Sequence, residues 1–169
     1  MALWSAGINT LADEVRAAVA SNFSATMKPL VVAFEETSAH KIVLSFGSTG
    51  KHYAQIKNGA PFDVFLAADV ARPALLEEQG LTNIGSRTTY ATGKLVLWTS
   101  QPNVNDIQDT LLSGLAIGHL AVANPKLSPY GMAAQQVMVE LGLWAMLKTR
   151  LVRGENIGQT FQFVHSGNA

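Results

Sequence analysis

The chain has 169 residues, of which 48% are hydrophobic and 14% are charged, so it can bury a substantial core in one domain or two small lobes. Its 12 Lys and Arg balance 12 Asp and Glu, and no basic run is interleaved with aromatic residues, which argues against a nucleic-acid-binding or anionic-membrane surface. The absence of cysteine excludes disulfides, thiolate metal sites and cysteine catalysis but leaves the cellular compartment open.

The first residues differ from the rest of the chain. Residues 1–13 are apolar and rich in small side chains, like the end of a secretory leader, but no positive charge precedes them and the apolar run is short. An ordinary N-terminal helix or an added leader is an equal alternative. We therefore set this leader-like segment apart from the folded part of the chain.

Strands and helices are predicted to alternate in residues 14–87, which we expect to form a first lobe. The predicted strands are 15–20, 41–46 and 63–67. The predicted helices are 24–36, 48–57 and one that ends at Gly80. In the first helix, helical spacing predicts a buried apolar face of Met27, Leu30, Val31 and Phe34. Three strand–helix alternations are typical of a parallel sheet, so the sequence predicts an α/β lobe.

A second, smaller α/β lobe is predicted in residues 101–169. Segment 88–100 is rich in β-branched and aromatic residues, with Gly93 as a bend, and is predicted to be a strand that crosses between the lobes. After it the predicted strands are 119–123 and 151–152, and the predicted helices are 130–141 and 157–165. Ligands favour the space between two such lobes, at the C-terminal ends of parallel strands.

Small and hydroxyl residues precede several of these predicted helices. The segments are ASN at 20–22, GSTG at 47–50, SPYG at 128–131 and ENIGQ at 155–159. Because the first turn of a helix has unpaired backbone N–H groups, several helix starts that face one another can bind an anion. Taken singly, each segment is more often a cap, a turn or part of the core, so only their co-occurrence favours a site.

Longer motifs carry a specific resemblance. They are LSFGSTGKHYAQIKNGAPFDVFLAAD at 44–69, GKLVLW at 93–98, ANPKLSPYG at 123–131 and GENIGQT at 154–160. In this order, over residues 14–169, they resemble the periplasmic molybdate-binding proteins of ABC importers, within the type II periplasmic binding proteins. The resemblance implies two α/β lobes that close on a tetrahedral oxyanion, molybdate or tungstate. It also implies no cofactor, no reaction, a periplasmic location and a membrane permease as partner.

The ligand positions of the resembled family fall on six residues of this chain: Ser21, Asn22, Ser48, Thr49, Tyr130 and Ile157. The resemblance implies hydroxyl, amide and backbone donors, with Ile157 giving only its backbone N–H. None of the six is Lys, Arg or His, so the implied site is neutral. A proton kept by the ligand needs an acceptor, so we expect phosphate to bind less well than molybdate, tungstate or sulfate.

The resemblance ends at Ala169, where the family continues, so we expect an incomplete second lobe. Open sheet edges and bare apolar faces would then favour self-association into a homo-oligomer. The alternative function is accordingly a truncated scaffold or interaction module that has lost or weakened oxyanion binding.

Other chemistries have less support in the sequence. The chain has no Gly-x-Ser-x-Gly elbow and no paired acid and base, so an enzyme ranks third. The four histidines are scattered without acidic companions at ligand spacing, so no direct metal-cation ligand is predicted. Asp63 and Asp69 bracket a predicted strand and are expected to have rim or capping roles.

Overall fold

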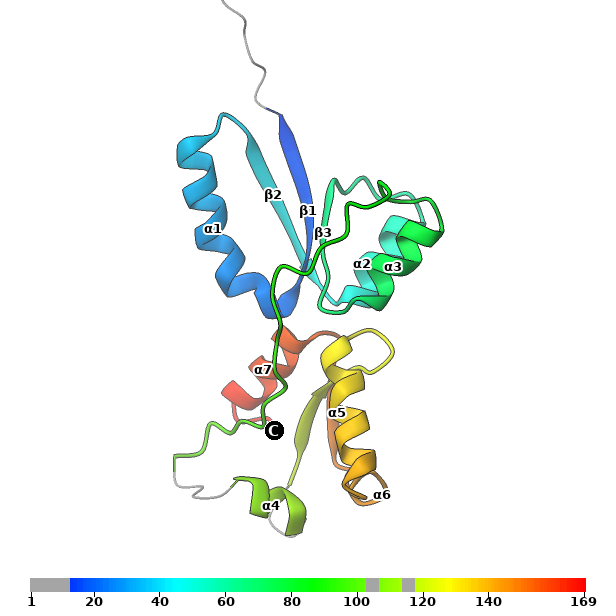
Figure 1. The fold of residues 1–169 in the computed structure, drawn as a ribbon. Helices are drawn as coiled ribbons and strands as arrows, with labels where there is room; N and C mark the ends of the chain where they lie inside the picture. The colour runs from blue at the N-terminus through cyan, green and yellow to red at the C-terminus, as the bar shows by residue number, and fades with distance from the viewer. Residues whose placement is uncertain (1–12, 103–106, 114–117) are drawn as a thin grey trace, which may run out of the picture.

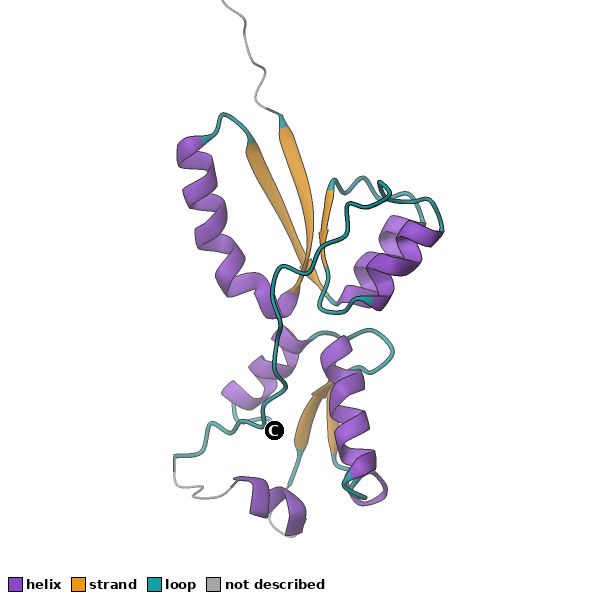
Figure 2. Ribbon diagram, in the orientation of Figure 1, coloured by secondary structure: helices purple, strands orange, loops and turns teal. Residues whose placement is uncertain are grey.

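The computed structural model describes residues 13–102, 107–113 and 118–169, so almost all of the leader-like segment lies outside it. The chain forms two α/β lobes, each built around its own parallel sheet, which confirms the predicted fold class (Figures 1 and 2). Among the described residues, no helix combines the length and the apolar character needed to cross a membrane.

The first lobe contains a three-stranded parallel sheet in the order β2-β1-β3. Its strands are β1 (Glu14–Ala20), β2 (Lys41–Gly47) and β3 (Val64–Leu66). Its helices are the 3-10 turn η1 (Ser21–Phe23), α1 (Ser24–Thr37), α2 (Thr49–Lys57) and α3 (Ala71–Glu78). The chain continues from β1 to β2 on one side and then to β3 on the other. The C-terminal end of β1 is therefore a topological switch point, where parallel α/β sheets place their ligands.

The end of β1 is the best-buried part of this lobe. Residues 17–20 are small or β-branched and are all buried. Ala17, Ala18 and Ala20 let the flanking elements come close to the sheet, and Val19 fills the space between them. α1 lies on one side of the sheet, and α2 and α3 lie on the other (Figure 1).

The second lobe contains a two-stranded parallel sheet of β4 (Leu120–Ala123) and β5 (Leu151–Gly154). Its helices are α4 (Ile107–Ser113), α5 (Pro129–Glu140), α6 (Trp144–Leu147) and α7 (Ile157–His165). Its core consists of Val122, Met138, Leu143 and Leu147. The short α4 and α6 have no counterpart in the elements predicted from the sequence, because helices of seven and four residues contain too few apolar positions to show a repeat.

Segment 88–100 runs from the first lobe to the second and is not a strand, contrary to the prediction (Figure 1). Side chains hold it in place: Tyr90 donates from its hydroxyl to the Ala67 carbonyl at 3.0 Å, and Trp98 stacks on Phe161 with ring centroids 4.8 Å apart. Strand propensity measures how well a residue fits beside a partner strand. No described strand pairs with this segment, so its backbone forms no ladder.

The apolar face predicted for α1 is present but is largely uncovered by the described residues. Leu30 is 50% exposed and Phe34 is 42% exposed, and no residue of α1 is fully buried. The neighbouring strand β2 is an edge strand whose Val43 and Phe46 are also exposed. Helical spacing shows which side chains share a face, but it does not show whether another element covers that face.

Candidate functional site

The starts of several helices face one another where the two lobes meet. η1 and α2 begin at the C-terminal ends of β1 and β2, and α5 and α7 begin beyond β4 and β5 (Figure 1). Two hydrogen bonds join these starts across the lobes: Gly158 N–H donates to Ser21 Oγ at 3.3 Å, and Gly50 N–H donates to the Leu127 carbonyl at 2.8 Å. The arrangement therefore concentrates first-turn backbone donors at one boundary.

Ser21 is the first residue of η1 and lies directly after the buried end of β1. Its side chain is half-buried, and its Oγ accepts the interlobe hydrogen bond from Gly158. The adjacent Asn22 is exposed. The structure thus places Ser21 against the first turn of α7, beside Ile157, and leaves Asn22 at the surface.

Ser48 and Thr49 are buried at the start of α2. Ser48 is the N-cap of this helix, with an extended backbone and a side chain only 4% exposed, and its Oγ accepts from Lys51 N–H at 3.3 Å. Thr49 is 0% exposed, and its Oγ1 accepts from Ala68 N–H at 3.0 Å. Ser48 is therefore a helix cap, and the same contact fixes the position of its hydroxyl oxygen.

The three hydroxyls share one hydrogen-bonding role. In each of Ser21, Ser48 and Thr49, the oxygen accepts a backbone N–H. A hydroxyl has one proton to donate and two lone pairs that accept, so each of these side chains keeps its own proton for a further acceptor. Because the oxygens are fixed by backbone groups, the set can donate to an anion without carrying charge itself.

Tyr130 and Ile157 occupy the helix starts of the second lobe. Tyr130 follows Pro129, which begins α5 and suits a first helical position because it lacks an N–H. Ile157 is the first residue of α7, after the N-cap Asn156, whose Oδ1 accepts from Gln159 N–H at 3.0 Å. Both Tyr130 and Ile157 are half-buried and line one hollow of 750 Å³, which extends along segment 94–101 and α7.

A second phenol lies near this hollow and stays neutral. Burial raises the pKa of Tyr90 above its usual value, and a negative charge on Tyr130 would raise it further. Tyr90 therefore stays protonated at neutral pH, and its hydroxyl donates to the Ala67 carbonyl. Segment 88–100 also passes close to Tyr130, because a Cβ on Gly93 would lie only 2.9 Å from the Tyr130 hydroxyl oxygen.

His52 is buried between α2 and the end of β1, and both of its ring nitrogens lie within hydrogen-bonding distance of other groups of the chain. It is 2% exposed, with Nε2 3.2 Å from the Val19 carbonyl oxygen and Nδ1 3.0 Å from Gln55 Oε1. Burial lowers its pKa, against the weaker opposing effect of these hydrogen bonds, so the ring is neutral near pH 7. The described residues contain no group of three His, Asp or Glu side chains that could hold a metal ion.

Of the two aspartates that bracket β3, Asp69 has the predicted capping role at the start of α3, whereas Asp63 binds the backbone of β1. Asp63 Oδ2 accepts from the backbone N–H of Arg16 at 2.7 Å, and Asp69 Oδ1 accepts from the backbone N–H of Arg72 at 3.0 Å. Neither aspartate is paired with a second carboxylate in these contacts, so they do not form an acid–base pair.

Two glycines of the sequence motifs, Gly131 and Gly154, bring helix starts against strand ends. A Cβ on Gly131 would lie 2.1 Å from the Ala123 carbonyl oxygen, and one on Gly154 would lie 2.6 Å from Thr160 Oγ1. These contacts are too short for any side chain, so only glycine lets α5 and α7 begin this close to β4 and β5. Gly131 is visible in the sequence as part of a turn, but the helix-to-strand contact is not.

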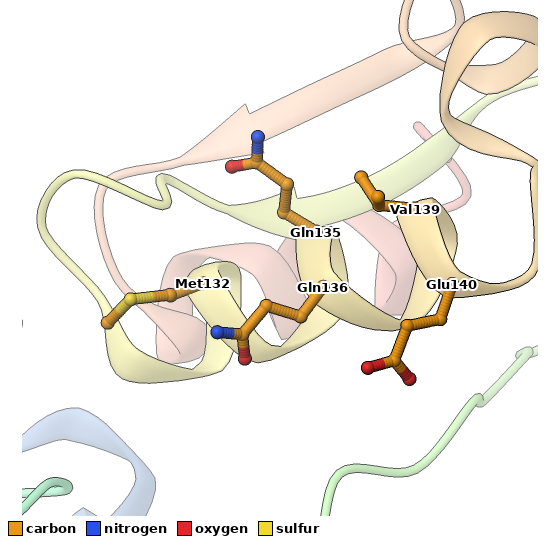
Figure 3. Close-up of a pocket in the computed structure, with 5 residues that line it drawn as sticks. All are labelled: Met132, Gln135, Gln136, Val139 and Glu140. Carbon is orange, nitrogen blue, oxygen red and sulfur yellow. The ribbon is translucent and has the colours of Figure 1, made fainter.

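A smaller hollow of 320 Å³ on α5 is not a plausible ligand site. It is lined by Met132, Gln135, Gln136, Val139 and Glu140, all from one helix. Figure 3 shows these side chains fanning outward from successive turns instead of converging on a point. A specific site needs polar groups that converge.

Two parallel-sheet lobes, with neutral donors at facing helix starts, define the class of two-lobed solute-binding proteins. The chain belongs to the family of bacterial extracellular solute-binding proteins, whose family model matches residues 15–169.

Individual relatives narrow this similarity. The chain is 53% identical over 158 residues to the molybdate-binding protein ModA of Azotobacter vinelandii. This alignment covers 94% of this chain and 63% of the relative. It is 44% identical over 158 residues to ModA of Rhodobacter capsulatus, with 94% and 62% coverage. The chain therefore spans less than two thirds of the length of these curated relatives.

A solved structure agrees with the sequence relatives. The Azotobacter vinelandii periplasmic molybdate-binding protein matches this fold with a TM-score of 0.87 and 42% identity, over 92% of this chain and 68% of that one. The similarity covers both lobes, because it extends over nearly all of this chain.

Proposed function

We propose that this chain binds a tetrahedral oxyanion, molybdate or tungstate, at the boundary between its lobes, as the solute receptor of an ABC importer. The observation that carries the proposal is the hydroxyl set of Ser21, Ser48 and Thr49, in which each oxygen accepts a backbone N–H and each proton is left to donate. The names of the relatives, which are molybdate-binding proteins, support the choice of anion.

A neutral site is sufficient for a dianion. A hydrogen bond to a charged group contributes about 1.5–3 kcal/mol, so five such bonds contribute roughly 8–15 kcal/mol before the costs of ordering the lobes and removing water. The backbone N–H groups of Thr49 and Ile157, the first residues of α2 and α7, add to the three hydroxyls, and the helix dipoles favour negative charge at the same ends. Binding therefore needs no buried Lys or Arg.

The donor set also favours anions without a proton. Phosphate keeps a proton near neutral pH, and that proton needs an acceptor, whereas the proposed site consists mainly of donors and each hydroxyl oxygen already uses one of its two lone pairs for a backbone N–H. Molybdate, tungstate and sulfate carry no such proton. We propose that the site discriminates against phosphate for this reason.

Titration calorimetry with molybdate, tungstate, sulfate and phosphate tests this function. We expect a measurable heat with molybdate that is lost in the double variant Ser48→Ala/Thr49→Val. The matched control is Ser86→Ala, which removes an exposed hydroxyl that donates to the Asn83 carbonyl. A folded wild-type chain that gives no heat with any of the four anions would contradict the proposal.

A periplasmic location and delivery to a membrane permease belong to the same proposal. The location rests on the periplasmic relative, and the permease rests on the resemblance to importer receptors. No reaction on the anion is proposed, because the relatives are named as binding proteins. Self-association stays a prediction that the exposed faces of α1 and β2 motivate, and a monomer in sedimentation at high concentration would contradict it.

A further inference from the structure

Besides the Gly158–Ser21 hydrogen bond, a second contact joins the two lobes, and it is between backbone groups. Gly50, in the first turn of α2, donates its N–H to the Leu127 carbonyl in the loop before α5 at 2.8 Å. Nearby, Nη2 of Arg72, from the first turn of α3, lies 3.4 Å from the Lys126 carbonyl oxygen in the same loop. Two neighbouring carbonyls of the second lobe are thus held by donors of the first.

Gly50 is required for this approach. A Cβ at this position would lie 2.7 Å from the Leu127 carbonyl oxygen, 3.1 Å from Leu127 Cα and 3.2 Å from Arg72 Nη2. The first two are backbone atoms, which cannot move aside as the end of a flexible side chain can. Any larger residue at position 50 would therefore hold the loop before α5 away from α2.

Arg72 is held in position by its neighbour Asp69. The carboxylate of Asp69 accepts from both the backbone N–H and the guanidinium Nη1 of Arg72. Both side chains are largely buried, with 15% and 14% of their surface exposed. The pair is neutral as a whole, so it directs a donor to the other lobe without adding net charge beside the helix start.

We propose that the Gly50–Leu127 and Arg72–Lys126 hydrogen bonds form a latch that holds the lobes together and sets how slowly a bound anion leaves. These contacts exist only when the lobes touch, so they stabilise that arrangement over any arrangement in which the lobes are apart. If the anion is held between the lobes, it leaves when they separate, so a weaker latch raises its dissociation rate. Gly50 and Arg72 are positioning residues in this scheme, and the effect on the anion rests on the proposed function.

Two variants test the latch in different ways. Gly50→Ala places a methyl group against the Leu127 backbone and favours helix formation in α2, so it separates the lobes without unfolding the helix. Asp69→Asn/Arg72→Met removes the guanidinium donor, keeps the side-chain acceptor for the backbone N–H at position 72 and leaves the net charge unchanged. Gly118→Ala is the control, because a Cβ there meets no atom of the described residues within 4 Å.

The first measurement is the radius of gyration by small-angle X-ray scattering without any oxyanion. We expect it to be larger in both latch variants than in the wild type and in Gly118→Ala. The second is the molybdate dissociation rate, which we expect to rise about tenfold or more in both variants. Radii of gyration that match the wild type in both folded variants would overturn the latch. If the wild type binds no molybdate, the proposed function fails, while the scattering comparison still decides whether the latch exists.

Discussion

Gly158 and Ser21 lie 137 residues apart in the sequence, and the backbone N–H of Gly158 donates to Ser21 Oγ at 3.3 Å. This hydrogen bond joins the first turn of α7 in the second lobe to the end of β1 in the first. It also fixes the oxygen of Ser21, so that the hydroxyl proton is the part of the side chain left to interact with an anion. One contact thus joins the lobes and orients a candidate ligand group.

Ser21→Ala should weaken molybdate binding about 10- to 100-fold, because it removes a hydrogen bond to a charged ligand and the acceptor for Gly158 N–H. The stability of the first lobe should change little, since Ser21 is only half-buried. Calorimetry with molybdate measures the affinity, and thermal melting measures the stability. Unchanged affinity in a folded Ser21→Ala variant would remove Ser21 from the site.

Thr49→Val should reduce both stability and binding. The side chain is fully buried and its shape is kept, but the Ala68 N–H loses its acceptor. Leaving a buried N–H unpaired costs about 1–3 kcal/mol, so urea denaturation should show a loss of that size. Calorimetry on the folded variant should show weaker molybdate binding. A loss of stability with wild-type affinity would mean that Thr49 only supports the fold.

The positions of these hydroxyls could be predicted because local sequence sets them. GSTG after an apolar strand indicates a helix start, and Ser48 and Thr49 do begin α2. The partners could not be predicted in the same way. Thr49 accepts from Ala68, two residues beyond the end of β3, and Ser21 accepts from the other lobe, so both contacts depend on tertiary packing.

His52 should make the stability of the chain depend on pH. Because burial holds its folded pKa below the 6.5 of a free histidine, the unfolded chain takes up a proton below pH 6.5 that the folded chain does not. Its contribution is therefore fully present above pH 6.5 and is lost as the pH falls towards the folded-state pKa.

The matched experiment compares His52→Gln with His40→Gln, which changes an exposed histidine. Free energies of unfolding are measured by urea titration between about pH 7.5 and pH 5.5. We expect the slope of stability against pH to be shallower in His52→Gln and unchanged in His40→Gln. Equal slopes in all three proteins would show that His52 does not titrate differently on folding.

Gly131→Ala should destabilise the second lobe. The new Cβ would lie 2.1 Å from the Ala123 carbonyl oxygen, so α5 must move away from the end of β4. Overpacking of this kind costs about 1–3 kcal/mol or more. Urea denaturation of Gly131→Ala and of the control Gly118→Ala, where a new Cβ meets no described atom within 4 Å, gives the comparison. Equal midpoints would mean that the backbone contact at Gly131 relaxes without cost.

The strands and most helices were predictable because strand–helix alternation is a local signal. β1, β2 and α7 lie within one or two residues of their predicted ranges. Segment 88–100 was predicted to be a strand because its composition suits one, yet a strand also needs a partner, which composition does not reveal. The interlobe contact of Gly50 could not be predicted for a similar reason. The sequence places this glycine at a helix start, but it does not indicate that the backbone of Leu127 packs against it.

A crystal structure of the chain with tungstate gives the sharpest test of the proposed binding site, because tungsten scatters X-rays anomalously and can be located without bias. We predict one strong anomalous peak at the boundary between the lobes, with tungstate oxygens about 2.7–3.2 Å from the hydroxyls of Ser21, Ser48 and Thr49 and from the backbone N–H of Ile157. A well-ordered structure in which the tungstate lies elsewhere, or in which no tungstate is bound, would contradict the account.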